Sequence, residues 1–262
     1  MKKITKRMER YGLLRFILHL KREMDAITKN KHVKGYYGIK GFFKNKRGLE
    51  VGGPSAIFRP YDYIPVYNKA KLLDGVNFSS STIWTGQVDD KKGFIINDKQ
   101  VGELYLADTT DLSVIPDESY DFLLSSNNIE HIANPMKAVE QWLLKLKKQG
   151  ILVVVAPRRE SNFDHQRAIV TFEHILEDYH NNVGEDDLTH IEEILALHDL
   201  SRDPLAGNFE QFKDRSYKNF ENRCLHHHIF DLDVLEQIFI YFNIEVVKRS
   251  SRENDYTIIG RK

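Results

Sequence analysis

A pair of glycines after a short apolar run constrains this chain more than any other feature. The run covers residues 49–51, and Gly52 and Gly53 follow it directly. A strand that ends in glycines can turn sharply and let the backbone approach a ligand where a Cβ would intrude. Two later apolar runs each lead to a carboxylate, Asp74 and Asp108. This spacing predicts an α/β sheet that binds a nucleoside-containing ligand at the ends of its strands.

The segments that follow alternate between strand and helix patterns. We expect a strand over residues 122–125, a helix over 135–147 and a Val-rich strand over 151–156. A helix over 231–242 and two more strands complete the chain. Strands that alternate with helices favour a parallel sheet with right-handed crossovers.

Two segments carry a resemblance to a known family, LEVGGPS and YDFLLSSNNIEHIANPMKAVEQWLLKLKKQGILVVVAPR. The chain resembles the class I S-adenosylmethionine-dependent methyltransferases over residues 47–157 and again from about 230. It departs from the family at the glycine loop, where Pro54 and Ser55 stand in place of a third glycine. The resemblance implies a Rossmann-like sheet that is mostly parallel, with an antiparallel last strand. LEVGGPS is similar to loops of methyltransferases from bacterial capsule and lipopolysaccharide pathways.

The order of the patterns predicts a division of the chain into three parts. Residues 158–228 interrupt the alternation and are dense in His, Asp, Glu and Arg, with helix patterns near 171–181 and 188–200. Such an insertion would lie above the ligand-binding edge of the sheet. We expect a basic helical arm over residues 1–46, an S-adenosylmethionine-binding α/β domain over 47–157 and 229–262, and a mainly helical substrate cap over 158–228.

The formal net charge of zero hides an asymmetry. Residues 1–46 hold fourteen Lys or Arg against three acidic residues, and an amphipathic helix is predicted over residues 4–27. Such an arm could meet nucleic acid, an anionic membrane surface, a phosphorylated substrate, or the acidic body of its own fold or of a partner subunit. A homodimer is therefore one interpretation.

Composition limits the compartment. The single cysteine, Cys224, excludes an internal disulfide framework and a cysteine-rich zinc site. No apolar run is long enough for a transmembrane helix, and the N-terminus lacks the pattern of a secretory signal. We expect a cytoplasmic protein.

The resemblance implies which residues bind S-adenosylmethionine. Asp74 would accept the ribose hydroxyls, Asp108 and Thr109 would lie beside the adenine, and Asn127 and Asn128 would lie beneath the methionine part. As alternatives, Asp74 could form a turn and Asp108 could cap a helix or turn. The residues expected around the amino-acid moiety and the turn are Glu50, Gly52, Gly53, Pro54 and Ser55.

Methylation of a hydroxyl requires a group that takes its proton, and a positioned base contributes about 10²–10⁴-fold. The candidates for a general base are His165, His174 and His227. Asp178 follows His174 by four residues on the same helix face, so that its carboxylate could orient the imidazole. The alternative is an exposed pair of small energetic value.

Several polar residues could bind the acceptor. Arg158, Arg159 and Arg167 suit bidentate recognition of phosphate, which hints at a nucleotide-linked acceptor. They could equally be solvated surface residues. Asp164 belongs to the same polar region, and His131 could orient the substrate or act as a helix-terminal hydrogen bonder.

A metal site is an alternative interpretation of the run Cys224-Leu225-His226-His227-His228. Alternate side chains of an extended segment share a face, so His226 and His228 could bind one ligand. With Asp164 they could hold a divalent metal that acidifies a sugar hydroxyl. We favour a histidine base over a metal, because chelating spacing is common by chance among eleven histidines.

These observations predict an S-adenosylmethionine-dependent O-methyltransferase that acts on a nucleotide-linked sugar in capsule or other surface polysaccharide biosynthesis. DNA is not an expected partner. One alternative is methylation of a phosphate-type decoration such as a capsule phosphoramidate, whose anionic oxygen needs no base. The others are an RNA or protein methyltransferase guided by the basic arm, and a scaffold that binds the cofactor without catalysis.

Overall fold

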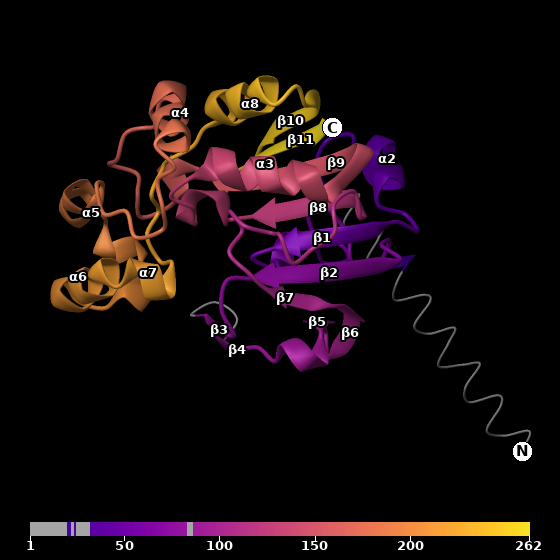
Figure 1. The fold of residues 1–262 in the computed structure, drawn as a ribbon, viewed down its shortest axis with the longest axis horizontal. Helices are drawn as coiled ribbons and strands as arrows, with labels where there is room; N and C mark the ends of the chain where they lie inside the picture. Colours follow the sequence, from indigo (N-terminus) through magenta and orange to yellow (C-terminus); the bar gives the residue numbers. More distant parts are fainter. Residues whose placement is uncertain (1–19, 22–23, 25–31, 83–85) are drawn as a thin grey trace, which may run out of the picture.

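A computed structural model describes residues 20, 21, 24, 32–82 and 86–262. Of the helix expected over residues 4–27, only residues 20, 21 and 24 are described, and of the remainder of the basic arm only residues 32–46 are. Seven strands form the central sheet in the order β10-β11-β9-β8-β1-β2-β7 (Figure 1). No helix among the described residues is long and apolar enough to cross a membrane.

The strand directions confirm the expected fold class. Neighbouring strands from β7 to β9 pair in parallel, whereas β11 pairs antiparallel with both β9 and β10. The sheet is therefore Rossmann-like with an inserted antiparallel last strand. Its strands are β1 (Arg47–Val51), β2 (Leu72–Asn77), β7 (Leu104–Leu106), β8 (Tyr120–Ser126), β9 (Leu146–Pro157), β10 (Glu245–Ser251) and β11 (Asp255–Arg261).

The polar segment between β2 and β7 forms two small hairpins. The first pairs β3 (Ser81–Thr82) with β4 (Gly86–Gln87), and the second pairs β5 (Phe94–Ile96) with β6 (Lys99–Gly102).

The helices divide into a group on the sheet and a group beyond it. Figure 1 shows the second group beyond the ends toward which the parallel strands point, as expected for a mainly helical insertion. Those on the sheet are α2 (Tyr36–Ile39), α3 (Pro135–Lys145) and α8 (Leu232–Tyr241), and those beyond it are α5 (Ile191–Leu197), α6 (Phe209–Tyr217) and α7 (Asn219–Asn222). The helix α4 (Phe172–His180) packs against α3 and α8.

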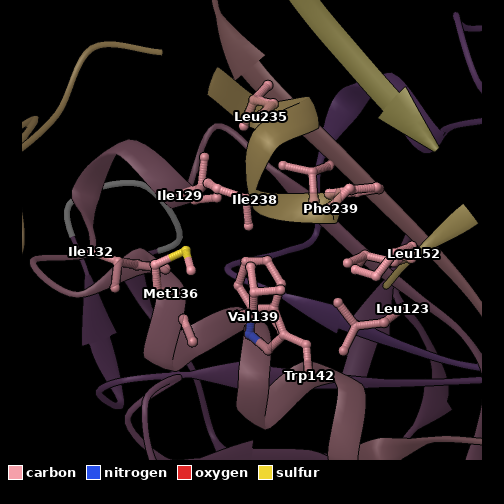
Figure 2. Packing of buried hydrophobic residues seen from close by; sticks show 14 of the residues in the cluster. Leu123, Ile129, Ile132, Met136, Val139, Trp142, Leu152, Leu235, Ile238 and Phe239 are labelled. Atoms are coloured by element: carbon pink, nitrogen blue, oxygen red, sulfur yellow. The ribbon is translucent and has the colours of Figure 1, made fainter. Parts of the chain in front are cut away.

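The strands β8 and β9 are buried on both faces, which is why their sequences are continuous apolar runs. In β9, Leu152 and Val154 pack into one core and Val153 and Val155 into the other, because successive side chains point to opposite faces. Figure 2 shows the first core, where residues of α3 and α8 meet the sheet. Its largest fully buried side chain is Trp142.

Trp142 also connects the core to the ligand-binding edge. Its indole Nε1 donates a hydrogen bond to Thr109 Oγ1 at 2.7 Å. Thr109 follows the strand β7, so that α3 positions a loop residue as well as filling the core. Truncation of a buried Trp costs about 3–5 kcal/mol.

Candidate functional site

A cavity of about 340 Å³ opens at the carboxyl ends of β1, β2 and β8. Two groups of polar residues line it, one at the strand ends and one from the insertion and the chain after it. The first group is Gly52, Ser55, Asn77, Asp108, Thr109, Asn127 and Asn128, followed by His131, and the second is Glu185, Arg223, Arg252 and Asp255.

The glycine turn forms the floor of the cavity, as the sequence predicts for Gly52. This residue has φ of 76°, and a Cβ on it would lie 2.6 Å from Asn128 Oδ1. The amide nitrogen Nδ2 of Asn128 is buried and has no hydrogen-bond partner within the described residues. An acceptor group of a ligand in the cavity would satisfy this donor.

Glu50, Gly53 and Pro54 are not among the residues that line the cavity. The Glu50 carboxylate is fully buried and accepts hydrogen bonds from the Ser55 amide at 2.8 Å and from the Tyr67 hydroxyl. Burial raises the pKa of Glu50 to about 7. A Cβ on Gly53 would lie 2.3 Å from this carboxyl group. Glu50 therefore holds the loop of residues 52–55 in place from the side away from the cavity.

Asp74 lies away from the position that the ribose prediction needs. Its carboxylate is fully buried within β2 and accepts hydrogen bonds from Arg47 Nη2, the Tyr120 hydroxyl and the Glu103 amide, each at 2.8 Å. The strand continues for three residues beyond it, to Asn77. The ribose assignment to Asp74 is corrected for this reason.

Asn77 occupies the strand end that the sequence analysis assigned to Asp74. It lines the cavity, and its side-chain amide could serve both ribose hydroxyls. To find Asn77 from the sequence, one would have to know where the strand β2 ends. Strand ends are the least certain part of a sequence-based assignment.

Asp108 and Thr109 line the cavity beside Asn127 and Asn128, so that the structure brings these four predicted residues together. Asp108 Oδ2 accepts from Arg223 Nη2 at 3.1 Å, which ties the loop after β7 to the insertion.

His131 is the one histidine among the residues that line the cavity. It ends the 3₁₀ turn Ile129–His131, and its Nδ1 lies 3.0 Å from the Leu225 carbonyl oxygen. A carbonyl only accepts, so the proton is on Nδ1 and Nε2 is the acceptor nitrogen of the ring. Burial lowers the pKa of His131 well below its ordinary value, which keeps the imidazole neutral.

His131 belongs to a group of four residues, which we call the His131 cluster. Its other members, Glu130, Asp164 and His226, are buried behind this wall. The rings of His131 and His226 meet edge to face, with centroids 4.5 Å apart. His226 Nδ1 forms a short contact with Asp164 Oδ2. Burial alone would lower the pKa of His226, but the Asp164 carboxylate outweighs it and raises that pKa.

Arg167 is held inside the protein and does not line the cavity. Its Nη1 atom donates to the His226 carbonyl at 2.7 Å and contacts Asp164 Oδ1 at 3.3 Å. Only 2% of its surface is exposed. The phosphate-binding prediction for Arg167, and the substrate-binding one for Asp164, are therefore corrected to roles inside the insertion.

Arg158 and Arg159 likewise lie outside the cavity lining. Arg158 Nη1 donates to the Arg252 carbonyl at 3.3 Å, and Arg159 Nη1 donates to the Arg167 carbonyl at 3.2 Å. Both also pair with Glu160. The cations that do line the cavity are Arg223 and Arg252, which sequence reasoning missed because no motif marks them.

The three histidines predicted as bases are not among the cavity residues. His165 Nε2 contacts Asp199 at 3.0 Å, and buried His227 Nε2 contacts the Asn219 amide nitrogen at 3.0 Å. His174 Nε2 lies 3.5 Å from Asp178, the predicted pairing on α4, but the pair faces other histidines. His131 replaces them as the histidine that can reach a ligand in the cavity.

The predicted metal set is also separated. His226 belongs to the His131 cluster, whereas His228 lies with His174 and His190. Residues 223–230 form no strand, so that the alternation of a regular pleat does not apply to them.

Residues 73–154 match the family model described as a methyltransferase domain. No curated protein matches the sequence. Similar solved structures include a SAM-dependent methyltransferase from Aquifex aeolicus (10% identity, 87% of this chain and 88% of that chain, TM-score 0.46). Others are an S-adenosylmethionine-dependent methyltransferase from Mesorhizobium loti (10%, 87% and 96%, 0.48) and the N-methyltransferase NodS from Bradyrhizobium japonicum WM9 (12%, 87% and 94%, 0.45).

Proposed function

Because the chain is a class I S-adenosylmethionine-dependent methyltransferase, we propose that it methylates a hydroxyl oxygen of a sugar. The sugar is carried on a nucleotide, and the product enters capsule or other surface polysaccharide. The chemistry of the cavity supports the hydroxyl acceptor. The sugar and the pathway rest on the resemblance of the LEVGGPS loop, and the nucleotide is an expectation from Arg158, Arg159 and Arg167, which do not line the cavity.

The residues at the strand ends suit the cofactor. Gly52 leaves space that a Cβ would fill, and Asn128 offers an unsatisfied amide donor beside it. Asn77 and Asp108 would hold the ribose and the adenine. When bound, S-adenosylmethionine supplies an electrophilic methyl carbon attached to a sulfonium.

The orientation of His131 is the observation that carries the proposal. Its Nε2 is the acceptor nitrogen of a neutral ring at the cavity wall. This nitrogen would take the hydroxyl proton, and bound S-adenosylmethionine would supply the methyl group and keep the electrons of the sulfur–methyl bond as a neutral thioether. The positive charge of the sulfonium would then be replaced by one on the imidazole, so that the net charge of the site would be unchanged.

The charges around the cavity favour a neutral acceptor over a phosphate-type anion. Arg223 contacts Asp108 at 3.1 Å and Glu185 at 2.5 Å, and Arg252 contacts Asp255 at 2.6 Å. Each cation that lines the cavity is thus already paired with a carboxylate. Paired carboxylates and guanidinium groups still hydrogen-bond sugar hydroxyls.

The insertion supplies part of this lining through Glu185 and Arg223. We therefore assign acceptor binding to residues 158–228 and cofactor binding to 47–157 and 229–262.

The test is incubation of the purified protein with isotopically labelled S-adenosylmethionine and a panel of nucleotide sugars, read by mass spectrometry. The expected result is one methylated sugar from wild-type protein and from His180→Gln, which changes an exposed histidine outside the cavity. His131→Gln should lose the product and keep cofactor affinity. Methylation of a phosphate-type acceptor instead, or full activity of His131→Gln, would refute the proposal.

A further inference from the structure

Three histidines from separate parts of the insertion come together away from the cavity. His174 belongs to α4, His190 precedes α5, and His228 lies on the extended segment before α8. One ring nitrogen of each lies within 4.8 Å of those of the other two. Asp178, one turn after His174, adds a carboxylate, and we call these four residues the His228 cluster.

The distances within the His228 cluster match those between ligands of one metal ion. Two ligands bound to zinc at about 2.0–2.1 Å in a tetrahedron lie about 3.3 Å apart. His174 Nε2 lies 3.1 Å from His190 Nε2 and 3.5 Å from Asp178 Oδ2. A hydrogen bond between the two imidazoles would explain the first distance, and Asp178 Oδ2 also lies 3.4 Å from His228 Nε2.

Two buried atoms of the cluster lack hydrogen-bond partners within the described residues. They are Asp178 Oδ2 and His228 Nδ1. His228 Nε2 lies 3.2 Å from the Ala133 carbonyl oxygen, which only accepts, so the ring proton is on Nε2 and Nδ1 holds the lone pair. Metal-binding histidines commonly donate their other ring nitrogen to a backbone carbonyl in this way.

The electrostatics of the His228 cluster suit a cation. The Asp178 carboxylate places negative charge within 3.5 Å of His174 Nε2 and His228 Nε2. The Glu193 carboxylate lies 3.9 Å from His190 Nδ1 and is shared with Arg167, whose Nε lies 3.5 Å from it. We propose that His174, His190 and His228, with Asp178 as the oxygen donor, form a zinc site that fastens α4, the loop before α5 and the segment before α8 together.

The second group with the spacing of a metal site, Glu130, His131 and His226, carries no such proposal. His226 is already held by Asp164, and Arg167 lies 3.3 Å from that carboxylate. With Nδ1 of His226 already held by this carboxylate, the group offers a metal ion one ligand atom fewer.

The test is metal analysis of the full-length protein after complete chelation and dialysis, followed by titration with zinc chloride. We expect about one zinc per chain and a higher unfolding temperature on zinc binding. Cobalt chloride in place of zinc should give the intense visible absorption of a tetrahedral cobalt site.

The variants His190→Ala and His228→Gln should lose the bound zinc, the cobalt absorption and the gain in unfolding temperature. His180→Ala, on the same helix α4 and exposed, is the matched control and should keep all three. His228→Gln retains a donor for the Ala133 carbonyl, which separates loss of metal from loss of folding. Wild-type protein that is folded but takes up no zinc, or equal uptake by folded His190→Ala, would overturn the proposal.

Discussion

His226 and His228 are two residues apart on one extended segment, yet they serve two sites built on opposite principles. In the His131 cluster, charges hold the residues, because His226 pairs with Asp164 and Asp164 pairs with Arg167. In the His228 cluster, three imidazoles converge, and within the described residues His228 contacts the Ala133 carbonyl, Asp178 and the rings of His174 and His190. The difference teaches that the partners of a histidine, rather than its place in a motif, decide what it can do.

The largest effect should come from removal of the buried charge. Asp164→Asn removes the buried carboxylate of Arg167 and leaves it only the more exposed Glu193, and the loss of one partner of a buried pair costs about 3–5 kcal/mol of stability. Urea unfolding measures this loss, which should be the same with and without chelator. Asp199→Asn, which disrupts the more exposed pair with His165, is the control and should leave the urea midpoint almost unchanged.

A comparable effect is expected on turnover. His131→Gln should lower kcat by about 10²–10⁴-fold, since a positioned base contributes about that much, while the affinity for S-adenosylmethionine changes little. Rapid-quench single-turnover assays together with calorimetric titration of the cofactor separate the two quantities. If affinity falls and kcat is unchanged, His131 is a binding residue and the two clusters differ less than we infer.

The third effect, on the pH dependence of stability, should come from Glu130 of the His131 cluster. Burial raises the pKa of Glu130 to about 7, whereas the unfolded chain releases this proton near 4.5. The stabilising contribution is full below pH 4.5 and is lost as the pH rises to 7, with a total of about 3 kcal/mol. Glu130→Gln should remove this decline from urea unfolding curves recorded between pH 4.5 and 8, and an unchanged decline would contradict the assignment.

The smallest effect concerns the His228 cluster. Asp178→Asn should weaken zinc binding about 10–100-fold, or about 1.4–2.7 kcal/mol, because it removes one ligand. Competition with a chromophoric chelator measures this change. In the presence of excess chelator the variant and the wild type should unfold alike, in contrast to Asp164→Asn. Equal zinc affinity would place Asp178 outside the ligand set.

The sheet was predictable because its signals are local. Apolar runs such as residues 151–156 and the turn at Gly52 and Gly53 are read within a few residues, and the strands follow from them, whereas the antiparallel last strand was implied by the family resemblance. The same locality explains the correction at Asp74, since only pairing with β1 and β7 carries the strand on to Asn77.

The insertion was predictable only in part because its contacts are distant in sequence. His226 meets Asp164 across 62 residues, and Arg223 meets Asp108 across 115. A run of histidines in the sequence indicates polar contacts, but it does not indicate which distant residues each histidine will contact. The pair of His174 and Asp178, four residues apart, was found by spacing, whereas its distant neighbours His190 and His228 were not.

Arg223 couples the two groups of residues that line the cavity. It has a left-handed backbone with φ of 54°, and it joins Asp108 from the sheet to Glu185 from the insertion. A ligand that draws Asp108 toward itself therefore also shifts Glu185 on the acceptor side. Linkage then requires reciprocity: the factor by which cofactor binding changes the affinity for the acceptor equals the factor by which the acceptor changes the affinity for the cofactor.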